Sequence, residues 1–215
     1  MEPTYIQGWP FYFFQADQSL VDRLLINLKQ FPFKPTNSVS DQKIATHYGY
    51  CVNGKESTCY YDKELYDWLY SCLSLVYKNH FPQYDFVIND LWPVKSLFGQ
   101  TSNFHYHSLS IFSGLLYLQD CKTATQYKFD DVFGNKWADF LTTEIKQITY
   151  KSNSEKGKLI IWPSHIRHSI AMNKEKEPRY TISFNSFFTG VMSTTATSLL
   201  TLNTKRAEET VFVDK

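Results

Sequence analysis

The pattern of apolar and polar residues divides the chain into a helical first part and a strand-rich second part. Apolar residues recur at helical spacing in 17–31 and again in about 63–79, which predicts two amphipathic helices. Asp62 is placed as the N-cap of the second helix, and Ser19 with Asp22 fits a capping box at the start of the first. The buried stripe of the first helix is expected to consist of Leu20, Leu24, Leu28 and Phe31.

From about Phe86 onward, short runs rich in Val, Ile, Phe, Tyr and Thr alternate with clusters of turn-forming residues, such as 133–136 and 152–157. This texture predicts strands without intervening helices, and therefore a sandwich or a jelly-roll barrel. The expected strands are 85–89, 94–98, 104–107, 112–119, 126–129, 144–150, 158–162, 166–172 and 179–188. Upstream of them, the dipeptide Asn53-Gly54 predicts a hairpin turn.

A length of 215 residues suits one domain with a sizeable core. We expect a single domain over 1–215, with a helical support region at about 1–84, a core at about 85–190 and a C-terminal extension at 190–215. The fold class is mainly β with supporting helices.

The charge balance disfavours some kinds of partner, and the cysteine content indicates the compartment. The chain carries 22 basic and 21 acidic residues, so no overall charge attracts nucleic acid or an anionic membrane. No basic stripe with interleaved aromatic residues gives a strong nucleic-acid signal. Four scattered cysteines, the absence of a leader pattern and the absence of an apolar run of roughly 18 residues predict a cytoplasmic protein with reduced thiols and no membrane span. If the gene belongs to a phage, the location would be the host cytoplasm.

The candidate metal-binding residues lie in His105-Tyr106-His107 and at His168. In a strand at 104–107, His105 and His107 would point to the same side and could hold one metal ion. His168 on a further strand would complete a face of three ligands. Imidazole ligands suit Fe, Zn, Cu or Ni, and three protein ligands leave other coordination positions open, as in catalytic metal sites.

Arg179 follows His168 at a spacing that predicts an antiparallel hairpin with its loop near Asn173 and Lys174. In that hairpin His168 and Arg179 would face each other with Cβ atoms roughly 5 Å apart. The planar guanidinium suits a carboxylate held by two hydrogen bonds, and Thr181 on the same face could add a third. Because the metal would have open coordination positions close to Arg179 and Thr181, we expect the ligand to be a small dicarboxylate that also chelates the metal.

Four sequence blocks in the C-terminal half resemble the Fe(II)- and 2-oxoglutarate-dependent oxygenases, in particular bacterial and phage members with a prolyl-hydroxylase-like core. The blocks are His105-x-His107, Ser113-Gly114-Leu-Leu-Tyr117-Leu, Gly157-Lys-Leu-Ile-Ile-Trp-Pro-Ser with His168, and Glu177-Pro178-Arg179-x-Thr181-Ile-Ser-Phe-Asn185. The resemblance implies a double-stranded β-helix, also called a jelly roll, with the N-terminal helices packed on one sheet.

The resemblance also implies the site and the reaction. It makes His105, His107 and His168 the ligands of Fe(II), and Arg179, Thr181 and Tyr117 the residues that bind the distal carboxylate of 2-oxoglutarate. With dioxygen, such an enzyme would hydroxylate a protein side chain, such as proline, or a small molecule, and release succinate and CO2.

One departure from the family pattern stands out. His107 occupies the position at which these enzymes carry Asp or Glu. Asp120 or another acid could substitute for a histidine ligand, and His165 could compete with His168.

Two other readings stay open. A cupin-type metalloenzyme with three histidine ligands fits the glycine and histidine spacing, although it lacks the expected glutamate after His107 and does not require Arg179. The other reading is a non-catalytic β-sandwich that binds a partner or has a structural role. The substrate and the oligomeric state are left open.

Overall fold

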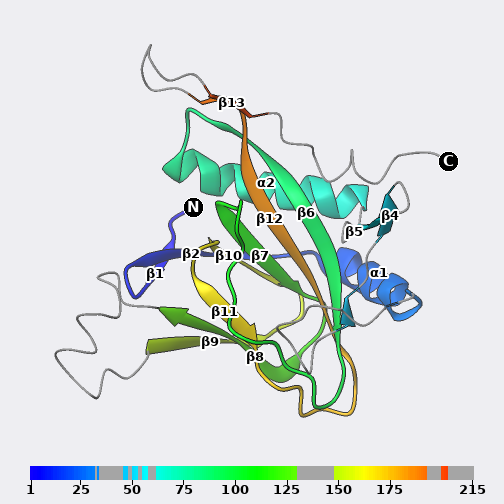
Figure 1. The fold of residues 1–215 in the computed structure, drawn as a ribbon. Helices are drawn as coiled ribbons and strands as arrows, with labels where there is room; N and C mark the ends of the chain where they lie inside the picture. Colours follow the sequence, from blue (N-terminus) through cyan, green and yellow to red (C-terminus); the bar gives the residue numbers. More distant parts are fainter. Residues whose placement is uncertain are drawn as a thin grey trace.

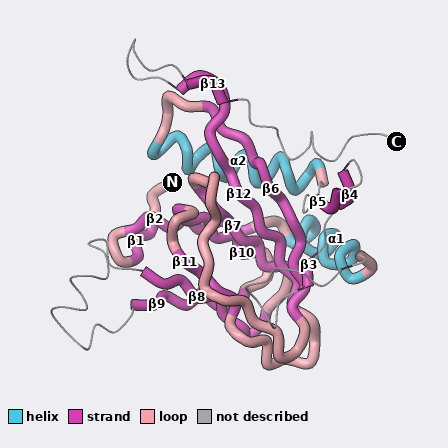
Figure 2. Tube along the Cα trace, in the orientation of Figure 1, coloured by secondary structure: helices cyan, strands magenta, loops and turns pink. Residues whose placement is uncertain are grey.

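The computed structural model describes residues 1–31, 33, 62–129, 148–192 and 200–202, together with the backbone of three short strands at 46–47, 50–52 and 55–57. Two sheets and two helices make up most of this structure (Figures 1 and 2). The main sheet has the spatial order β1 (Thr4–Ile6), β2 (Trp9–Gln15), β10 (Lys158–Pro163), β7 (Phe112–Tyr117), β12 (Arg179–Met192), β6 (Asp85–Ser96) and β3 (Thr46–His47), with β13 (Leu200–Leu202) paired to β12. The smaller sheet consists of β11 (Arg167–Ile170), β8 (Cys121–Phe129) and β9 (Ile148–Ser154).

The two faces of the main sheet are buried in different ways. Its outer face packs against helices α1 (Gln18–Lys29) and α2 (Lys63–His80), and Figure 1 shows α2 lying across β12 and β6. Leu116, Ile182 and Phe184 belong to this outer core. Its inner face packs against the smaller sheet in a second apolar cluster, which includes Leu115 and Tyr117. Successive residues of β7 thus alternate between two cores, because strand side chains alternate between faces.

The predicted fold class is confirmed: the described chain is mainly β, with two helices on one sheet and two facing sheets as in a double-stranded β-helix. Gly114 is required at one point of close packing between β7 and β12. A Cβ atom there would lie 2.1 Å from the buried ring of Phe184, its neighbour across the two strands. Only glycine leaves room for this ring.

Both predicted helices are present, and one of the two predicted caps is confirmed. The Asp62 carboxylate accepts a hydrogen bond from the Leu65 backbone N–H at 3.0 Å, and it also binds Arg23 of α1, so it connects the helices. The capping box at the start of α1 is wrong. Asp17 is the N-cap without a side-chain hydrogen bond, and the Asp22 carboxylate binds Gln18 and Lys156 instead.

Several strand boundaries differ from the prediction. The two expected strands at 85–89 and 94–98 form one strand, β6, which runs through Pro93. Strand β9 continues through Ser154, where a turn was expected, because Ser152 and Ser154 are buried against β8. The hairpin of β1 and β2 was not predicted, although β2 pairs with β10 in the main sheet.

The hairpin at Asn53-Gly54 is confirmed by the pairing of the strands around it, β4 (Tyr50–Val52) and β5 (Lys55–Ser57). The turn expected at 133–136, the first residues of the strand expected at 144–150 and most of the extension after 192 lie outside the described residues. Neither α1 nor α2 has the length and apolar character needed to cross a membrane.

Candidate active site

Three histidines meet at the edge of the smaller sheet. His168 lies on β11, and His105 joins its edge through one isolated bridge, with N···O distances of 2.9 and 2.8 Å. The backbone N–H of His107 donates to the Ser164 carbonyl at 3.3 Å. The expected strand at 104–107 is wrong, because this segment follows β11 through separate contacts and does not form a continuous ladder.

The ring nitrogens of His105, His107 and His168 lie within 4.8 Å of one another. His107 Nε2 and His168 Nε2 are 3.3 Å apart, and the Nδ1 atoms of His105 and His168 face backbone carbonyl oxygens. Such contacts fix the ring orientation and leave the opposite nitrogen free for a metal. In the described part of the chain, no carboxylate or thiol joins this group. The arrangement can hold a metal ion through three neutral nitrogen ligands.

Burial keeps the imidazoles of His107 and His168 uncharged. It lowers the pKa of His107 to about 4, with a further contribution from His105. Burial also lowers the pKa of His168 well below its ordinary value, and His105 and His107 add to the effect. A metal binds only the neutral form of imidazole, so both side chains stand ready for ligation at neutral pH.

These pKa shifts predict that the metal-free protein loses stability as the pH falls below about 6.5. Between that pH and about 4, the unfolded chain binds protons at His107 and His168 that the folded chain excludes. Each such histidine removes about 1.4 kcal/mol per pH unit from the free energy of unfolding. Urea unfolding at pH 7, 6 and 5 measures this slope, which should flatten in His107→Gln. An equal slope in the variant would contradict the assignment.

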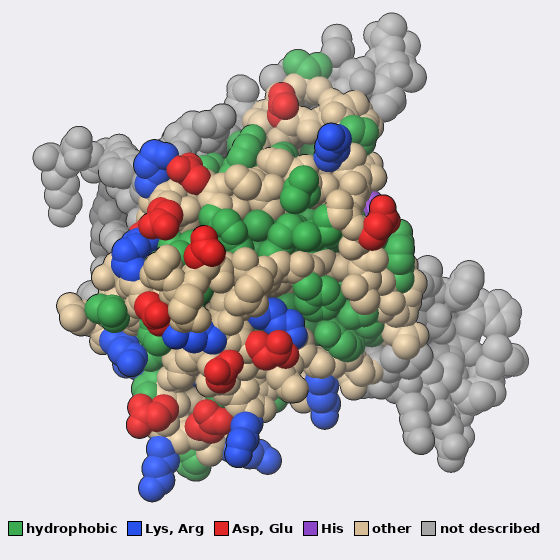
Figure 3. Space-filling model, turned by 180° about the vertical axis from the view of Figure 1, so that it is seen from behind, with side chains coloured by type: hydrophobic (Ala, Val, Ile, Leu, Met, Phe, Trp, Pro, Cys, Tyr) green, Lys and Arg blue, Asp and Glu red, His purple; other side chains and the backbone are tan. Residues whose placement is uncertain are grey.

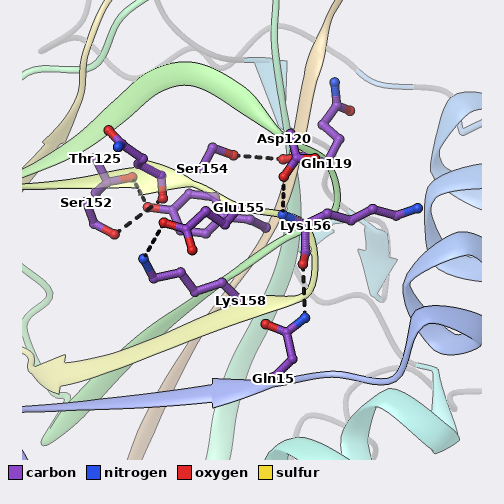
Figure 4. Close-up of polar contacts among 11 residues, drawn as sticks. Gln15, Gln119, Asp120, Thr125, Ser152, Ser154, Glu155, Lys156 and Lys158 are labelled. Carbon is purple, nitrogen blue, oxygen red and sulfur yellow. Dashed lines mark hydrogen bonds and ion pairs between the residues drawn. The ribbon is translucent and has the colours of Figure 1, made fainter.

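Two alternative ligands considered from the sequence lie elsewhere. The exposed His165 ring packs against Trp9 with a centroid distance of 4.4 Å and is not part of the histidine group. Asp120 lies at the turn between β7 and β8, where its carboxylate accepts the Lys156 backbone N–H at 2.8 Å (Figure 4). Neither residue belongs to the group of three histidines.

Arg179 is fully buried at the start of β12, with an exposed fraction of 1%. Its Nη2 donates to Thr125 Oγ1 at 3.3 Å, and its guanidinium lies 5.3 Å from the centroid of the Tyr117 ring. Nε and Nη1 have no hydrogen-bond partner among the described residues. Burial lowers the pKa of this guanidinium. Burying a cation that has two unpaired hydrogen-bond donors costs free energy of folding unless an anion binds to it.

The predicted hairpin that would set His168 opposite Arg179 is wrong. Strand β11 pairs with β8 in the smaller sheet, whereas β12 pairs with β6 and β7 in the main sheet. The two residues therefore lie in different sheets and are not paired across neighbouring strands. Tyr127 of β8 borders both: its ring is 6.3 Å from that of His168, and it interacts electrostatically with Arg179.

Tyr117 and Thr181 lie beside Arg179, as the sequence predicts. Thr181 pairs with Tyr117 across β12 and β7, and it shares the inner face of β12 with Arg179. The Tyr117 hydroxyl donates to Thr125 Oγ1 at 2.8 Å. Figure 4 shows Thr125 next to Ser152, which also hydrogen-bonds the Tyr117 hydroxyl. The sequence analysis did not identify Thr125 as a site residue, because a threonine in a strand does not by itself indicate a functional role.

Tyr127 and Trp162 fill the region next to His168, and the sequence did not single them out. The Trp162 ring lies 4.9 Å from the His168 ring and 5.0 Å from the Tyr127 ring. Tyr127 Oη and Trp162 Nε1 are buried and, like two nitrogens of Arg179, have no partner among the described residues. Four unused donors in one buried region are rare in folded proteins. They fit a ligand rich in acceptor oxygens, such as a keto diacid.

Comparison with known proteins agrees with this chemistry. Residues 90–185, which carry all three histidines and Arg179, match the model of the family described as "Putative 2OG-Fe(II) oxygenase". No significant sequence match is found among curated proteins.

Solved structures share the fold at low sequence identity. A prolyl-4-hydroxylase from Pseudomonas putida is 10% identical, with a TM-score of 0.55 over 85% of this chain and 93% of that one. A Trichoplax adhaerens prolyl hydroxylase, solved with a hypoxia inducible factor peptide fragment, is 15% identical, with a TM-score of 0.55 over 82% and 83%. HygX from Streptomyces hygroscopicus, solved with nickel, 2-oxoglutarate and hygromycin B, is 10% identical, with a TM-score of 0.58 over 95% and 96%.

The family match places the histidines and Arg179 in a family that uses Fe(II), 2-oxoglutarate and dioxygen. The fold is that of solved 2-oxoglutarate oxygenases. Residues 90–185 thus match the model of the 2OG-Fe(II) oxygenase family, and this match indicates a 2-oxoglutarate-dependent oxygenase.

Proposed function

We propose that His105, His107 and His168 hold Fe(II), and that Arg179 binds the distal carboxylate of 2-oxoglutarate with help from Tyr117 and Thr181. The reaction is the hydroxylation of a protein side chain, such as proline, or of a small molecule. The observation that carries this proposal is the buried, uncompensated guanidinium of Arg179, which shares Tyr127 as a neighbour with His168.

The residues present fit both groups. Three neutral nitrogens within 4.8 Å suit a divalent first-row metal. The guanidinium offers Nε and Nη1 to a carboxylate, and Thr125 holds the third guanidinium nitrogen in place. When bound, iron and 2-oxoglutarate would allow dioxygen to act as the oxidant for C–H hydroxylation, while oxidative decarboxylation of 2-oxoglutarate would release succinate and CO2.

The chain's own side chains bind and orient the co-substrate. Tyr117 fixes Thr125 by a hydrogen bond, and Thr125 fixes Arg179, so the guanidinium is held before the ligand arrives. Preorganised donors cost little reorganisation on binding. Trp162 and Tyr127 cover the path from Arg179 to His168 with aromatic surface, which excludes water from the region where the keto acid would lie.

Anaerobic titration of Fe(II)-loaded protein with 2-oxoglutarate tests the proposal. We expect a weak visible charge-transfer band that saturates at one equivalent and is absent when zinc replaces iron. After admission of air, succinate should form. A three-histidine cupin would bind iron but produce neither the band nor succinate, and either absence would overturn the proposal.

We also propose a single domain over 1–215 in a cytoplasmic protein. Packing of α1 and α2 on the main sheet and insertion of β2 beside β10 support the first statement. Cys72 and Cys121 are buried free thiols, as expected in a reducing compartment. Lys and Arg side chains are interspersed with Asp and Glu on the face drawn in Figure 3, which gives no support to a nucleic-acid partner.

A further inference from the structure

Asp90 brings a carboxylate to the inner face of the main sheet, close to the histidines. Along β12 the inner-face residues run from Arg179 through Thr181 and Ser183 to Asn185, and Asn185 pairs with Asp90 on β6. Arg179 and Asn185 are six residues apart, about 20 Å along the strand. Asp90 thus lies toward the opposite end of this face from the proposed 2-oxoglutarate pocket.

Trp92 connects Asp90 to the metal site. It occupies the next inner-face position of β6, about 7 Å along the strand from Asp90. Its ring lies 5.5 Å from the ring of His107 and is half-buried. A group bound between Asp90 and Trp92 would therefore lie beside the three histidines, on the side away from Arg179.

The carboxylate is fixed in place by amide groups. Its Oδ2 accepts hydrogen bonds from Asn185 Nδ2 and Asn89 Nδ2, both at 3.2 Å, where Asn89 is the extra residue of a β-bulge. Bulges commonly re-aim side chains beside functional sites. The other oxygen, Oδ1, has no hydrogen-bond partner among the described residues, and the side chain is half-buried.

Further hydrogen bonds tie this carboxylate to the loop that carries His107. Asn185 Oδ1 accepts the Ser113 hydroxyl at 2.8 Å, and Ser113 Oγ is 2.8 Å from Ser164 Oγ. The Ser164 carbonyl in turn accepts the backbone N–H of His107. Because the Ser113 proton points to Asn185, the Ser164 hydroxyl must donate to Ser113. The position of Asp90 relative to the histidines is therefore rigid.

We propose that Asp90 and Trp92 select a substrate that carries an ammonium or guanidinium group, which they hold while an adjacent carbon lies at the metal. This inference rests on the proposed function and specifies its substrate class. A rigid carboxylate oxygen accepts charge-assisted N–H bonds, and the face of an indole ring attracts a cation. The cationic group can belong to a lysine or arginine side chain of a peptide or to a free amine.

Binding to Mn(II)- and 2-oxoglutarate-loaded protein, measured by calorimetry without oxygen, tests the inference. The probes are arginine with its neutral isostere citrulline and lysine with norleucine, each as a single residue with an acetylated α-amino group and in the centre of a blocked tripeptide, so that the side chain is the only possible cation. We expect one cationic probe to bind at least tenfold more tightly than its isostere, and the single-residue and peptide forms distinguish the two sources. Equal affinity within a pair, or no binding by any cationic probe, would overturn the inference.

Two variants separate the role of Asp90 from that of the fold. Asp90→Asn keeps an oxygen for the two amides, so we expect the charge preference to fall to within about threefold while Asp90→Glu retains part of it. Asp85→Asn, an exposed carboxylate on the same strand, is the matched control and should keep the full preference. A full preference in Asp90→Asn would refute the role of this carboxylate. Failure of the unaltered protein to bind Mn(II) or 2-oxoglutarate would instead refute the proposed function.

Discussion

Arg179→Met is expected to weaken 2-oxoglutarate binding strongly and at the same time to raise the melting temperature of the ligand-free protein. The guanidinium is fully buried and two of its nitrogens have no partner among the described residues. Removing one member of a buried charge pair costs about 2–5 kcal/mol, so 2-oxoglutarate affinity should fall by about 30-fold or more.

The stability effect has the opposite sign because the ligand-free protein carries the cost of burying this cation. Replacing buried charge by apolar atoms of similar volume stabilises proteins by about 1–4 kcal/mol. For a chain of this size, each kcal/mol corresponds to about 2–4 °C in melting temperature. A residue that only supported the fold would give a loss of stability instead.

Calorimetric titration with 2-oxoglutarate and thermal unfolding without ligand measure the two effects. Arg179→Lys keeps a positive charge but loses the planar fork, so it should recover only part of the affinity. The interpretation fails if Arg179→Met binds 2-oxoglutarate as well as the unaltered protein, or if its ligand-free form melts at a lower temperature.

His168→Ala is expected to lower metal affinity by at least 100-fold, because only two ligands would remain. His107→Asp should have the opposite effect on Mn(II) and tighten its binding by about tenfold, since a charged oxygen ligand replaces a neutral nitrogen. Without metal, His107→Asp should be less stable, because the new carboxylate would be desolvated where His107 now lies.

Mn(II) titration followed by electron paramagnetic resonance measures both affinities at pH 7.5. His165→Ala is the matched control, because this histidine is exposed against Trp9 and should leave metal affinity unchanged. Metal affinity within threefold of the unaltered protein in His168→Ala would remove His168 from the ligand set. Weaker Mn(II) binding in His107→Asp would show that His107 does not occupy a ligand position.

Local patterns were sufficient for much of the fold. The periodicity of Leu20, Leu24 and Leu28 predicted α1, and Asp62 marked the start of α2. Runs rich in β-branched and aromatic residues predicted strands at 112–119 and 179–188, and the structure contains both. Their side chains enter two apolar cores on opposite faces of the sheet. Long strands whose apolar residues fill a buried face can be predicted from the sequence alone.

Strand ends and caps were less predictable. Ser152 and Ser154 look like turn residues in the sequence, yet they are buried in β9 because β8 lies beside them. The prediction ended one strand at 89 and began another at 94, yet β6 continues through this stretch, paired with β12 on one side. Tertiary contacts decided these cases against local propensity.

Patterns within the sequence were enough to predict the strand-rich core, the two helices and the candidate residues, which are His105, His107, His168, Arg179, Thr181 and Tyr117. How these residues meet depends on the three-dimensional arrangement, since β11 and β12 lie in different sheets and the predicted hairpin does not form. This arrangement also brought in Thr125, Tyr127 and Asp90, which are ordinary strand residues until register and sheet order place them. The physical reason is that strand pairing joins residues far apart in sequence, and no local pattern specifies which edges will pair.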